Sequence, residues 1–440
     1  MPLPPQYVPV RGARLCVIST AAFLALLGST ADAVSVRSGF AVRNLVTGIR
    51  QATSVDWGPD GRMFVGTKLG EVYLVDLDGS RRRIVDLRSH VNSYSDRGLE
   101  GIAVDSDFAS NHYLWIVYVY EPNSNRLKST GPKTSRLVRV TVHPDDTTSG
   151  QTIVLGKSKK GRCPKPDNHS DCIPADGPSH MVGTVRSASD GTLWVGSGDG
   201  SDFANLDPVS IRAHDERTYA GKIMHIDRSG HGLPGHPFCR PHGGSDDLTR
   251  VCSKLYAKGL RNPYRFDFRP GGGLIAGDVG WRTKEELDFV AKGRDYGWPC
   301  YEGGAGTRYG AKEPTWRHKR ACDGSGGMYS LEGTARHARP PVLDYSHGQT
   351  AAIIGGPRFP GGAGYPGSYK GKVFFGDFPH GTVKTFDPAT HKVRSFASDV
   401  GVVDLELAPN GHLVAVDIGA EQIREFVPKA PAATGLVTGR

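Results

Sequence analysis

Residues 256–303 read YAKGLRNPYRFDFRPGGGLIAGDVGWRTKEELDFVAKGRDYGWPCYEG, and this stretch says more about the fold than any other part of the chain. Three turn sequences lie in it at short offsets: RNP at 261–263, GDVG at 277–280 and YGWP at 296–299. Apolar positions alternate between these turns, which is typical of β-strands. The stretch therefore predicts successive strands joined by tight turns.

Part of this stretch repeats along the chain as a turn phrase that contains Gly and is followed by alternating apolar positions. Each copy predicts a tight turn, whose Gly tolerates positive φ, and then a strand. The copies are GPDGRMFVG (58–66), ASDGTLWVGSGDG (188–200), RPGGGLIAGDVG (269–280) and APNGHLVAVDIG (408–419), with two looser ones, NHYLWIVYVYE (111–121) and GKVFFGDFPHG (371–381). Six copies predict an all-β chain folded as a six-bladed β-propeller.

Between the copies, the segments 121–135, 156–179, 201–218 and 300–345 are predicted to be long inter-strand loops. Loops of that length are usually functional or disordered. TKEELDFVAKG (283–293) is the best candidate for helical structure, and it fits either a short helical turn or an edge strand.

The 256–303 stretch resembles the signature segment of the glucose/sorbosone dehydrogenase family, and the likeness extends over residues 38–428. In that family the three turns stand on successive strands of a β-propeller, and the RNP and GDVG turns line its cofactor-facing end. The resemblance implies a secreted sugar dehydrogenase of the aldose or sorbosone type that depends on pyrroloquinoline quinone (PQQ) and calcium. It also implies a small sugar or alcohol substrate and an external electron acceptor as partners.

The N-terminus has the pattern of a secretory signal peptide over residues 1–33. Arg11 and Arg14 precede an apolar run at 15–27, and Ala31-Asp32-Ala33 follows it as a small-residue cleavage site. The alternative is a retained membrane anchor, but thirteen apolar residues are short for a bilayer span. We therefore predict a secreted or periplasmic protein without a membrane span, a propeller at 38–428 and a disordered tail at 429–440.

Six cysteines remain once the predicted signal is removed. An even number of cysteines in an exported chain predicts disulfides. Their proximity in sequence favours Cys163 with Cys172, Cys239 with Cys252, and Cys300 with Cys322. Metal binding by thiolates is the weaker alternative, because no C-x-x-C motif occurs.

The formal net charge of +9 raises the question of nucleic-acid binding. The densest basic run, Arg81-Arg82-Arg83, follows an Asp78-Gly79 turn and is most simply a solvated hairpin tip. We therefore predict no nucleic-acid partner.

His180 is the candidate catalytic residue. It lies in SHMVGTVRSASDGTLWVGSGDG (179–200), where a loop enters a predicted strand. A base that takes a sugar hydroxyl proton needs a pKa near the working pH, which an unperturbed imidazole has. In the resembling family this histidine is the general base; the alternative is a histidine that caps a strand. Asp199 and Asp202 follow the strand and are candidates for substrate contact or for local turn acceptors.

Arg261 and Asn262 of the RNP turn are candidates for cofactor binding. A guanidinium and an amide at a strand entrance can bind the carboxylates or carbonyls of a quinone, whereas the alternative is bonding to the backbone of adjacent blades. By resemblance Asn262 faces the cofactor. Asp96 and Arg97 precede GLEGIA (98–103), which is similar to the family's GLLGIA, and occupy places that face the cofactor there.

The resemblance also implies two calcium sites. The carbonyls of Gly280 and Trp281 would hold an ion that bridges to PQQ, so Gly280 counts toward cofactor binding as well. The side chain of Glu286 and the carbonyl of Tyr296 would hold a second, structural ion. Calcium prefers such hard oxygen ligands.

The sequence departs from the family near its C-terminus. Quinone-dependent members carry a lysine and an Arg-x-Arg-Asp that clamp the carboxylates of PQQ. This chain has Pro379 or His380 in place of the lysine, and Gly401 and Val403 in place of the arginines. Either other cations replace them or the cofactor binds weakly or not at all; the candidates are His380, Arg358, Lys384 and Arg424.

Two other functions stay open. The missing clamp favours a non-catalytic propeller that binds a protein or a glycan, of the hedgehog-interacting-protein-like type. A calcium-dependent hydrolase of the lactonase type would need carboxylates gathered at the axis, for which the strand-end residues are candidates, namely Asp199, Asp278, Asp377 and Asp417. The same residues could close turns.

Overall fold

The structure is a computed structural model and describes residues 34–159, 161–203, 207–239, 246–269, 272–304, 313–314, 322, 338–348 and 350–429. The predicted signal peptide lies outside these residues, as does the predicted tail except for Lys429. No helix among the described residues is long and apolar enough to cross a membrane.

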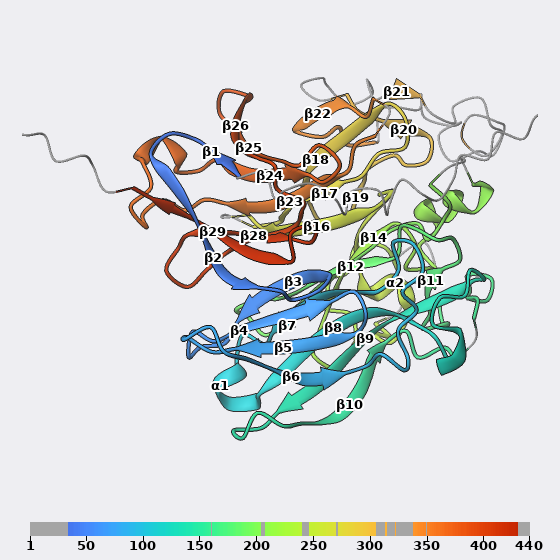
Figure 1. The fold of residues 1–440 in the computed structure, drawn as a ribbon. Coiled ribbons are helices and arrows are strands. Elements are labelled where there is room, and N and C mark those ends of the chain that lie inside the picture. The colour runs from blue at the N-terminus through green and yellow to red at the C-terminus, as the bar shows by residue number, and fades with distance from the viewer. Residues whose placement is uncertain are drawn as a thin grey trace, which may run out of the picture. The chain divides into compact units, whose positions relative to one another are not determined.

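Among the described residues, six largely antiparallel sheets, blades 1 to 6, form the propeller, and apart from β1, β2 and β19 their strands follow one another along the chain (Figure 1). Blade 1 contains β3 (Ala52–Trp57), β4 (Met63–Thr67), β5 (Glu71–Val75) and β6 (Arg81–Asp86). Blade 2 contains β7 (Leu99–Val104), β8 (Tyr113–Tyr120), β9 (Lys133–Val142), β10 (Thr148–Leu155) and β11 (Ile173–Ala175). Blade 3 contains β12 (Val182–Ser187), β13 (Leu193–Ser197), β14 (Lys222–Ile226), β15 (Leu255–Lys258) and, paired in parallel, β19 (Arg294–Asp295).

Blade 4 contains β16 (Pro263–Phe268), β17 (Leu274–Asp278), β18 (Lys284–Val290) and β22 (Leu343–Ser346). Blade 5 contains β23 (Ile353–Arg358), β24 (Val373–Asp377), β25 (Thr382–Asp387), β26 (Lys392–Ser398) and β1 (Ser35–Val36). Blade 6 contains β27 (Val402–Leu407), β28 (Leu413–Asp417), β29 (Gln422–Pro428) and β2 (Phe40–Thr47). The remaining elements are β20 (Tyr301–Glu302), β21 (Glu313–Pro314), the helices α1 (Phe108–Asn111) and α2 (Val251–Lys254), and 3-10 turns at Ser124–Arg126, Pro208–His214 and Gly367–Tyr369.

The first and last parts of the propeller meet in blade 6. Strand β2, from the N-terminal part, pairs antiparallel with β29, so that Phe40 lies opposite Pro428, and Figure 1 shows the blue strand beside the red ones. The first strands of the blades contact one another in the cyclic order β3, β7, β12, β16, β23 and β27, and β27 contacts β3 again. This closure protects sheet edges that would otherwise be open to pairing. The prediction of an all-β, six-bladed propeller is confirmed.

The repeated phrase corresponds to the turn between the first two strands of a blade and to the second strand itself. In blades 1, 3 and 6 this turn contains Gly61, Gly191 and Gly411, with φ of +83°, +81° and +80°. These are left-handed conformations that cost a side-chain-bearing residue free energy. The recurrence of Gly at this one place is therefore a requirement of the turn.

The segment 283–293 is the one element whose type was ambiguous in the sequence. It forms β18, which pairs with β17 on one side and with β22 on the other. It is neither a helical turn nor an edge strand, because β22 covers its outer side. Four of its seven residues, 285–288, are buried in a row, which explains why no clear alternation marked it as a strand.

The apolar core is divided among the spaces between adjacent blades. Six clusters of buried side chains each take members from two neighbouring blades. Examples, in order around the ring, are Phe64 and Leu114, Val117 and Val195, Ile223 and Phe266, Ile275 and Ile353, Phe374 and Leu405, and Val416 and Val55. Each blade is thus buried on both faces, as its long apolar strands require.

Arg265 on β16 joins four other blades near the centre of the ring. Its side chain is 1% exposed, and its Nε lies 3.0 Å from Oδ1 of Asp404 in blade 6. Its guanidinium also donates to the carbonyls of Gly183 at 2.6 Å, Thr53 at 2.8 Å and Glu100 at 2.8 Å. A single buried cation therefore links blade 4 to blades 1, 2, 3 and 6.

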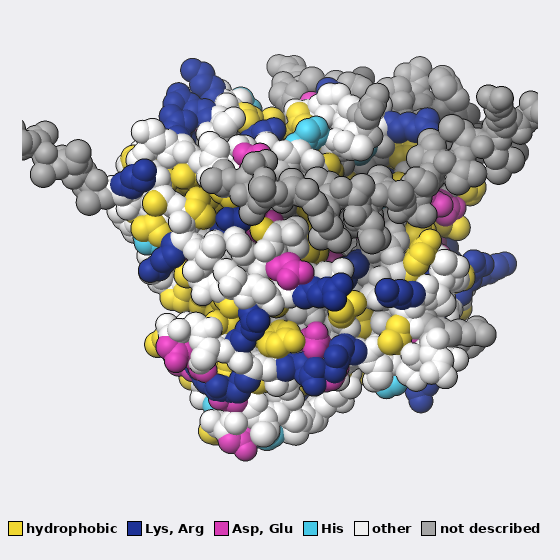
Figure 2. All heavy atoms as spheres, in the orientation of Figure 1, with side chains coloured by type: hydrophobic (Ala, Val, Ile, Leu, Met, Phe, Trp, Pro, Cys, Tyr) yellow, Lys and Arg dark blue, Asp and Glu magenta, His cyan; other side chains and the backbone are white. Residues whose placement is uncertain are grey.

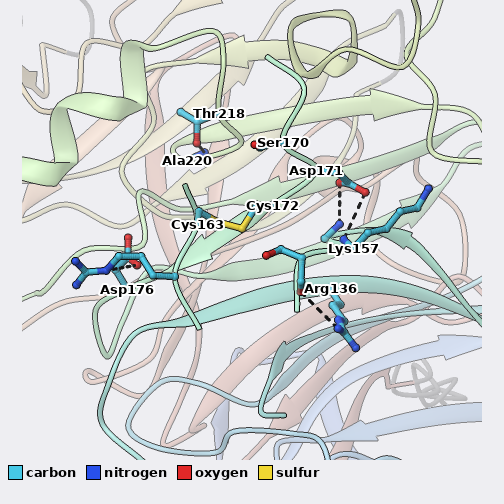
Figure 3. Close-up of a disulfide and its surroundings, with 12 residues drawn as sticks. Arg136, Lys157, Cys163, Ser170, Asp171, Cys172, Asp176, Thr218 and Ala220 are labelled. Carbon is cyan, nitrogen blue, oxygen red and sulfur yellow. Dashed lines mark hydrogen bonds and ion pairs between the residues drawn. A yellow bond between two sulfur atoms is a disulfide. The ribbon is translucent and has the colours of Figure 1, made fainter. Parts of the chain in front are cut away.

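The three predicted disulfides are present, with the predicted partners. Figure 3 shows the Cys163–Cys172 bond, beside which the Asp171 carboxylate accepts hydrogen bonds from the backbone N–H groups of Gly156 at 2.9 Å and Lys157 at 3.4 Å. These bonds attach the disulfide loop to the end of blade 2.

Asn168, in the same loop, connects two disulfides. Its carbonyl accepts from Val251 N–H at 2.9 Å, and its Oδ1 accepts from Cys252 N–H at 2.9 Å. The side chain is buried and lies in an Asn168-His169-Ser170 sequon. The amide oxygen has a structural partner, and the buried amide nitrogen is inaccessible to a glycan in the folded protein.

We expect Asn168→Ala to lower the free energy of unfolding by about 1–3 kcal/mol, because the buried Cys252 N–H loses its acceptor. Thermal unfolding of the oxidised protein measures this. His169→Ala, at an exposed neighbour in the same loop, is the matched control. Equal midpoints for the two variants would contradict the assignment.

Surface charge is mixed on the face drawn in Figure 2, where Lys and Arg side chains lie beside Asp and Glu. In the Arg81-Arg82-Arg83 run, which begins β6, Arg82 pairs with Asp76 at 2.7 Å and Arg83 with Glu71 at 2.9 Å. Acidic partners therefore neutralise much of this run.

Candidate active site

Strand-end carboxylates order the loops at one end of the propeller. Asp278, at the end of β17, accepts from the backbone N–H groups of Arg261 at 3.0 Å and Asn262 at 2.6 Å, just before β16. In blade 5 Asp377 accepts from Ala352 N–H, and in blade 6 Asp417 accepts from Gly401 N–H at 3.1 Å. Each carboxylate ties the end of a second strand to the start of the first strand of its blade.

His180 lies at this end, two residues before β12, and its side chain is only 4% exposed. Its Nδ1 is 2.9 Å from Oδ1 of Asp199 and 3.4 Å from Oγ of Ser201. Its backbone has φ of +58°, a left-handed conformation that is rare for a residue with a side chain and is enriched at functional sites. The surrounding bonds hold it there, since its carbonyl accepts from Gly200 N–H at 2.7 Å.

Asp199 connects this histidine to the YGWP corner. Its Oδ2 accepts from the indole Nε1–H of Trp298 at 2.7 Å, and its Oδ1 also accepts from Ser201 N–H at 3.0 Å. The backbone N–H of Asp199 donates to the Arg261 carbonyl at 2.8 Å. The sequence suggested that Asp199 contacts substrate or closes a turn. In the structure its carboxylate closes a local turn with Ser201 and also positions the imidazole. No role had been predicted for Trp298.

The protonation states of this pair follow from burial and charge. Burial lowers the pKa of His180 below its ordinary 6.5, the Arg261 guanidinium lowers it further, and the Asp199 carboxylate only partly opposes both. Burial would raise the pKa of Asp199, but the charge and hydrogen bond of His180 outweigh it and hold that pKa well below its usual range. His180 is therefore neutral near pH 7, and its Nδ1–H donates to an ionised Asp199.

This arrangement leaves Nε2 of His180 unprotonated. No described residue makes a hydrogen bond with this nitrogen, because the bonds of the ring all involve Nδ1. A neutral imidazole whose orientation is fixed by a carboxylate and whose Nε2 has a lone pair can accept a proton from a bound hydroxyl group.

Asn262 lies beside the backbone of His180. A Cβ placed on Gly198 would be 2.5 Å from the His180 carbonyl oxygen and 2.9 Å from Oδ1 of Asn262, so only glycine allows the two to approach. The Arg261 guanidinium reaches the GDVG turn, where it donates to the carbonyls of Val279 at 2.9 Å and Gly280 at 2.5 Å. The histidine, the RNP turn and the GDVG turn therefore meet at one end of the ring.

The Glucose / Sorbosone dehydrogenase family model matches residues 49–417 of this chain, which span all six blades. The chain belongs to this family. It is 28% identical over 352 residues to the HIPL1 protein of Arabidopsis thaliana, covering 68% of this chain and 47% of that protein. It is 23% identical over 274 residues to quinoprotein glucose dehydrogenase B of Acinetobacter calcoaceticus, covering 59% and 52% respectively. The chain thus spans about half the length of these relatives.

Solved structures agree on the fold. The apo-form soluble aldose sugar dehydrogenase of Escherichia coli superposes with a TM-score of 0.66 at 16% identity, covering 89% of this chain and 100% of that one. The PQQ-bound aldose sugar dehydrogenase of Streptomyces coelicolor gives 0.61 at 19% identity, covering 89% and 99%.

Two of the residues predicted to bind the cofactor in this glucose/sorbosone dehydrogenase family member, Asp96 and Arg97, lie in surroundings that differ from each other. Arg97 is fully buried, and its guanidinium donates to the carbonyls of Ala175, Gly177 and Ser129. Arg97 therefore holds two loops together through their backbone carbonyls. Asp96 is exposed, and its negative charge slightly opposes the lowering of the His180 pKa.

Three of the four predicted metal ligands, Gly280, Glu286 and Tyr296, line one small cavity of about 10 Å³, together with Arg261 and Glu302 among others. Such a volume holds about one water molecule. Glu286 Oε1 accepts from Gly303 N–H at 2.6 Å, and Trp281 N–H donates to Glu302 at 2.5 Å. The oxygen donors suit calcium chemically, but the Arg261 guanidinium already occupies the Gly280 carbonyl. No group of three or more His, Cys, Asp or Glu side chains that could hold a metal occurs among the described residues.

The four candidate replacements for the family's clamp each contact other groups of the protein. Arg424 is buried against Asp417 at 2.7 Å, and Arg358 donates to the Gly371 carbonyl at 2.9 Å, at the far end of β23. Lys384 lies over the Tyr345 ring at 5.4 Å. His380 is half exposed, with its Nδ1 2.9 Å from Asp377. The described residues therefore do not fit the clamped binding mode of PQQ that the resemblance implies.

Proposed function

We propose that this chain is a sugar dehydrogenase that oxidises a hydroxyl-bearing carbon of an aldose or sorbosone-type sugar to a carbonyl. His180 Nε2 takes the hydroxyl proton. A quinone-class acceptor, when bound, would take up the hydride from the same carbon, so that one C–H and one O–H bond break and the two electrons lost by the carbon pass to that acceptor.

The observation that carries the proposal is the buried chain of contacts from Trp298 through Asp199 to His180. Trp298 and Ser201 fix the carboxylate, and the carboxylate fixes the tautomer and orientation of the imidazole. When His180 takes a proton, the ionised Asp199 stabilises the resulting imidazolium. A histidine that merely capped a strand would need neither the buried carboxylate nor an unbonded Nε2.

PQQ, when bound, would supply the hydride acceptor, as the PQQ-bound relative suggests. The chain's own contribution at that point would be Asn262, whose Oδ1 packs against Gly198 on which the His180 carbonyl also packs. The three disulfides support a secreted or periplasmic location, because such bonds persist in oxidising compartments.

A second candidate function is a propeller that binds a glycan or a protein without catalysis. The observation that favours it is that described arginines near the site already donate hydrogen bonds to carbonyl or carboxylate oxygens of the protein. These arginines are Arg97, Arg212, Arg261 and Arg424. The hydrolase alternative gains no support, because Asp278, Asp377 and Asp417 close turns and Asp199 holds His180.

Reconstitution of the purified protein with PQQ and Ca²⁺, followed by addition of aldoses, tests the proposal. We expect a bound-quinone absorbance that changes on reduction, together with reduction of a dye acceptor. If no quinone binds at concentrations up to about 100 µM, where even weak ligands bind, the result would support the second candidate, a non-catalytic propeller that binds a glycan or a protein. Activity that EDTA removes without any quinone requirement would support the hydrolase.

The pH dependence of kcat/KM tests the state of His180. A base acts when it is neutral, so activity falls as pH drops through its pKa. Because that pKa is lowered from 6.5, we expect the acidic limb below pH 6.5. In Asp199→Asn the limb should move lower still, since the carboxylate raises the pKa of His180. A limb above 6.5 in the unmodified protein would contradict this assignment.

A further inference from the structure

The GDVG turn already holds a positive charge of the protein's own. Arg261 Nη1 donates to the carbonyls of both Val279 and Gly280, at 2.9 and 2.5 Å. Calcium also binds main-chain carbonyls, at about 2.3–2.6 Å. A calcium ion would therefore compete with the Arg261 guanidinium for the Gly280 carbonyl oxygen.

Contacts from several sides hold Arg261 as a whole, backbone and side chain, in this position. Arg261 is 4% exposed, and its centre lies 5.3 Å from the Trp298 ring. The Asp278 carboxylate binds its backbone N–H, and the Asp199 N–H binds its carbonyl. These contacts come from β17, from the residues after β13 and from the YGWP corner, so the placement does not depend on a single bond.

The space at the turn is too small for both cations. The adjoining cavity of about 10 Å³ holds about one water molecule. Two positive groups on one carbonyl oxygen would also repel each other strongly in this poorly hydrated surrounding.

We propose that the Arg261 guanidinium is the resident cation of the GDVG turn, and that a divalent ion and this guanidinium exclude each other at the Gly280 carbonyl. The turn keeps its shape without metal, and an ion binds there only after the side chain has moved away. This inference concerns cation binding and does not depend on the proposed dehydrogenase activity.

Terbium, a luminescent substitute for calcium, tests the proposal on the full-length oxidised protein. Excitation of tryptophan should sensitise an ion at this turn, because Trp281 directly follows it and Trp298 lies beside the guanidinium. We expect Arg261→Met to bind Tb³⁺ at least about tenfold more tightly than the unmodified protein, because a charge on the shared oxygen is removed. Ca²⁺ should displace the ion.

Two matched variants complete the design. Arg261→Lys keeps a positive charge and should retain weak binding. Arg97→Met removes another buried guanidinium that donates to carbonyls, those of Ala175 and Gly177, away from the GDVG turn, and should show no gain. Equal Tb³⁺ affinity in the unmodified protein and in Arg261→Met would overturn the proposal.

A measurement on the unmodified protein covers the case in which Arg261→Met does not fold. Binding to the native state raises the thermal midpoint, and the stabilisation grows with the logarithm of the ligand concentration divided by the dissociation constant. We expect the midpoint to be the same in EDTA and in Ca²⁺ at about 1 mM, far above the dissociation constant of a tight site. Tight Ca²⁺ binding that Arg261→Lys leaves unchanged would overturn the exclusion.

Discussion

Replacing His180 with Gln is expected to reduce kcat/KM by about 100- to 10,000-fold, the usual contribution of a positioned general base. Glutamine can occupy a similar volume, but it cannot accept a proton near neutral pH. The loss should appear in kcat, because the residue acts on the reacting hydroxyl. Steady-state rates with an aldose, PQQ, Ca²⁺ and a dye acceptor measure it.

His412 provides the control for this experiment. Its Nδ1 also pairs with a buried carboxylate, that of Glu425 at 2.8 Å, but it lies in the turn between β27 and β28, at the other end of blade 6. His412→Gln should keep the activity of the unmodified protein. If His180→Gln oxidised sugar as fast as His412→Gln, the base would be another group.

Replacing Arg265 with Met is expected to lower the free energy of unfolding by about 3–5 kcal/mol, the usual effect of removing one partner of a buried ion pair. The change leaves the carboxylate of Asp404 buried without its partner at 3.0 Å. It also removes the donor to three carbonyls in other blades. Denaturant unfolding with intact disulfides measures the loss.

The double variant Arg265→Met/Asp404→Asn separates the charge from the packing. Without Arg265, Arg186 at 3.9 Å is the only described cation that still pairs with the buried Asp404 carboxylate. Neutralising Asp404 removes this poorly compensated charge, so the double variant should recover part of the lost stability. Arg217→Ala, which breaks a pair with Asp215 at 2.9 Å on an exposed turn, should leave the midpoint close to that of the unmodified protein. A small effect of Arg265→Met would show that the blades do not depend on this link.

Much of the fold follows from local sequence. Alternating strands recur six times, in five cases after a turn glycine, and each copy requires its conformation independently of the others, so the number of blades could be predicted. The disulfide partners followed from proximity in the chain. β18 was ambiguous because blade 4 buries both its faces, which removes the alternation that identifies a half-buried strand.

The site was predicted only in part. His180, Arg261, Asn262 and Gly280 were recognised by their motifs, and the structure brings them together at one end of the ring. No role could be predicted for Trp298 of the YGWP corner, because its hydrogen bond to Asp199 joins residues 99 positions apart in the chain. Arg97 resembled a cofactor ligand in sequence, yet its guanidinium is buried among carbonyls.

The sequence by itself determined the repeated unit, the number of blades, the disulfide pairing and the identity of the candidate base. The first three depend on φ, strand alternation and thiol chemistry within short segments, and the candidate base was recognised by the motif around it. The tertiary structure alone decided which charges meet: that Asp199 holds His180, that Arg261 lies on the Gly280 carbonyl, and that Arg265 joins five blades. Closing the ring places residues from distant segments within hydrogen-bonding distance, and no local pattern records those distances.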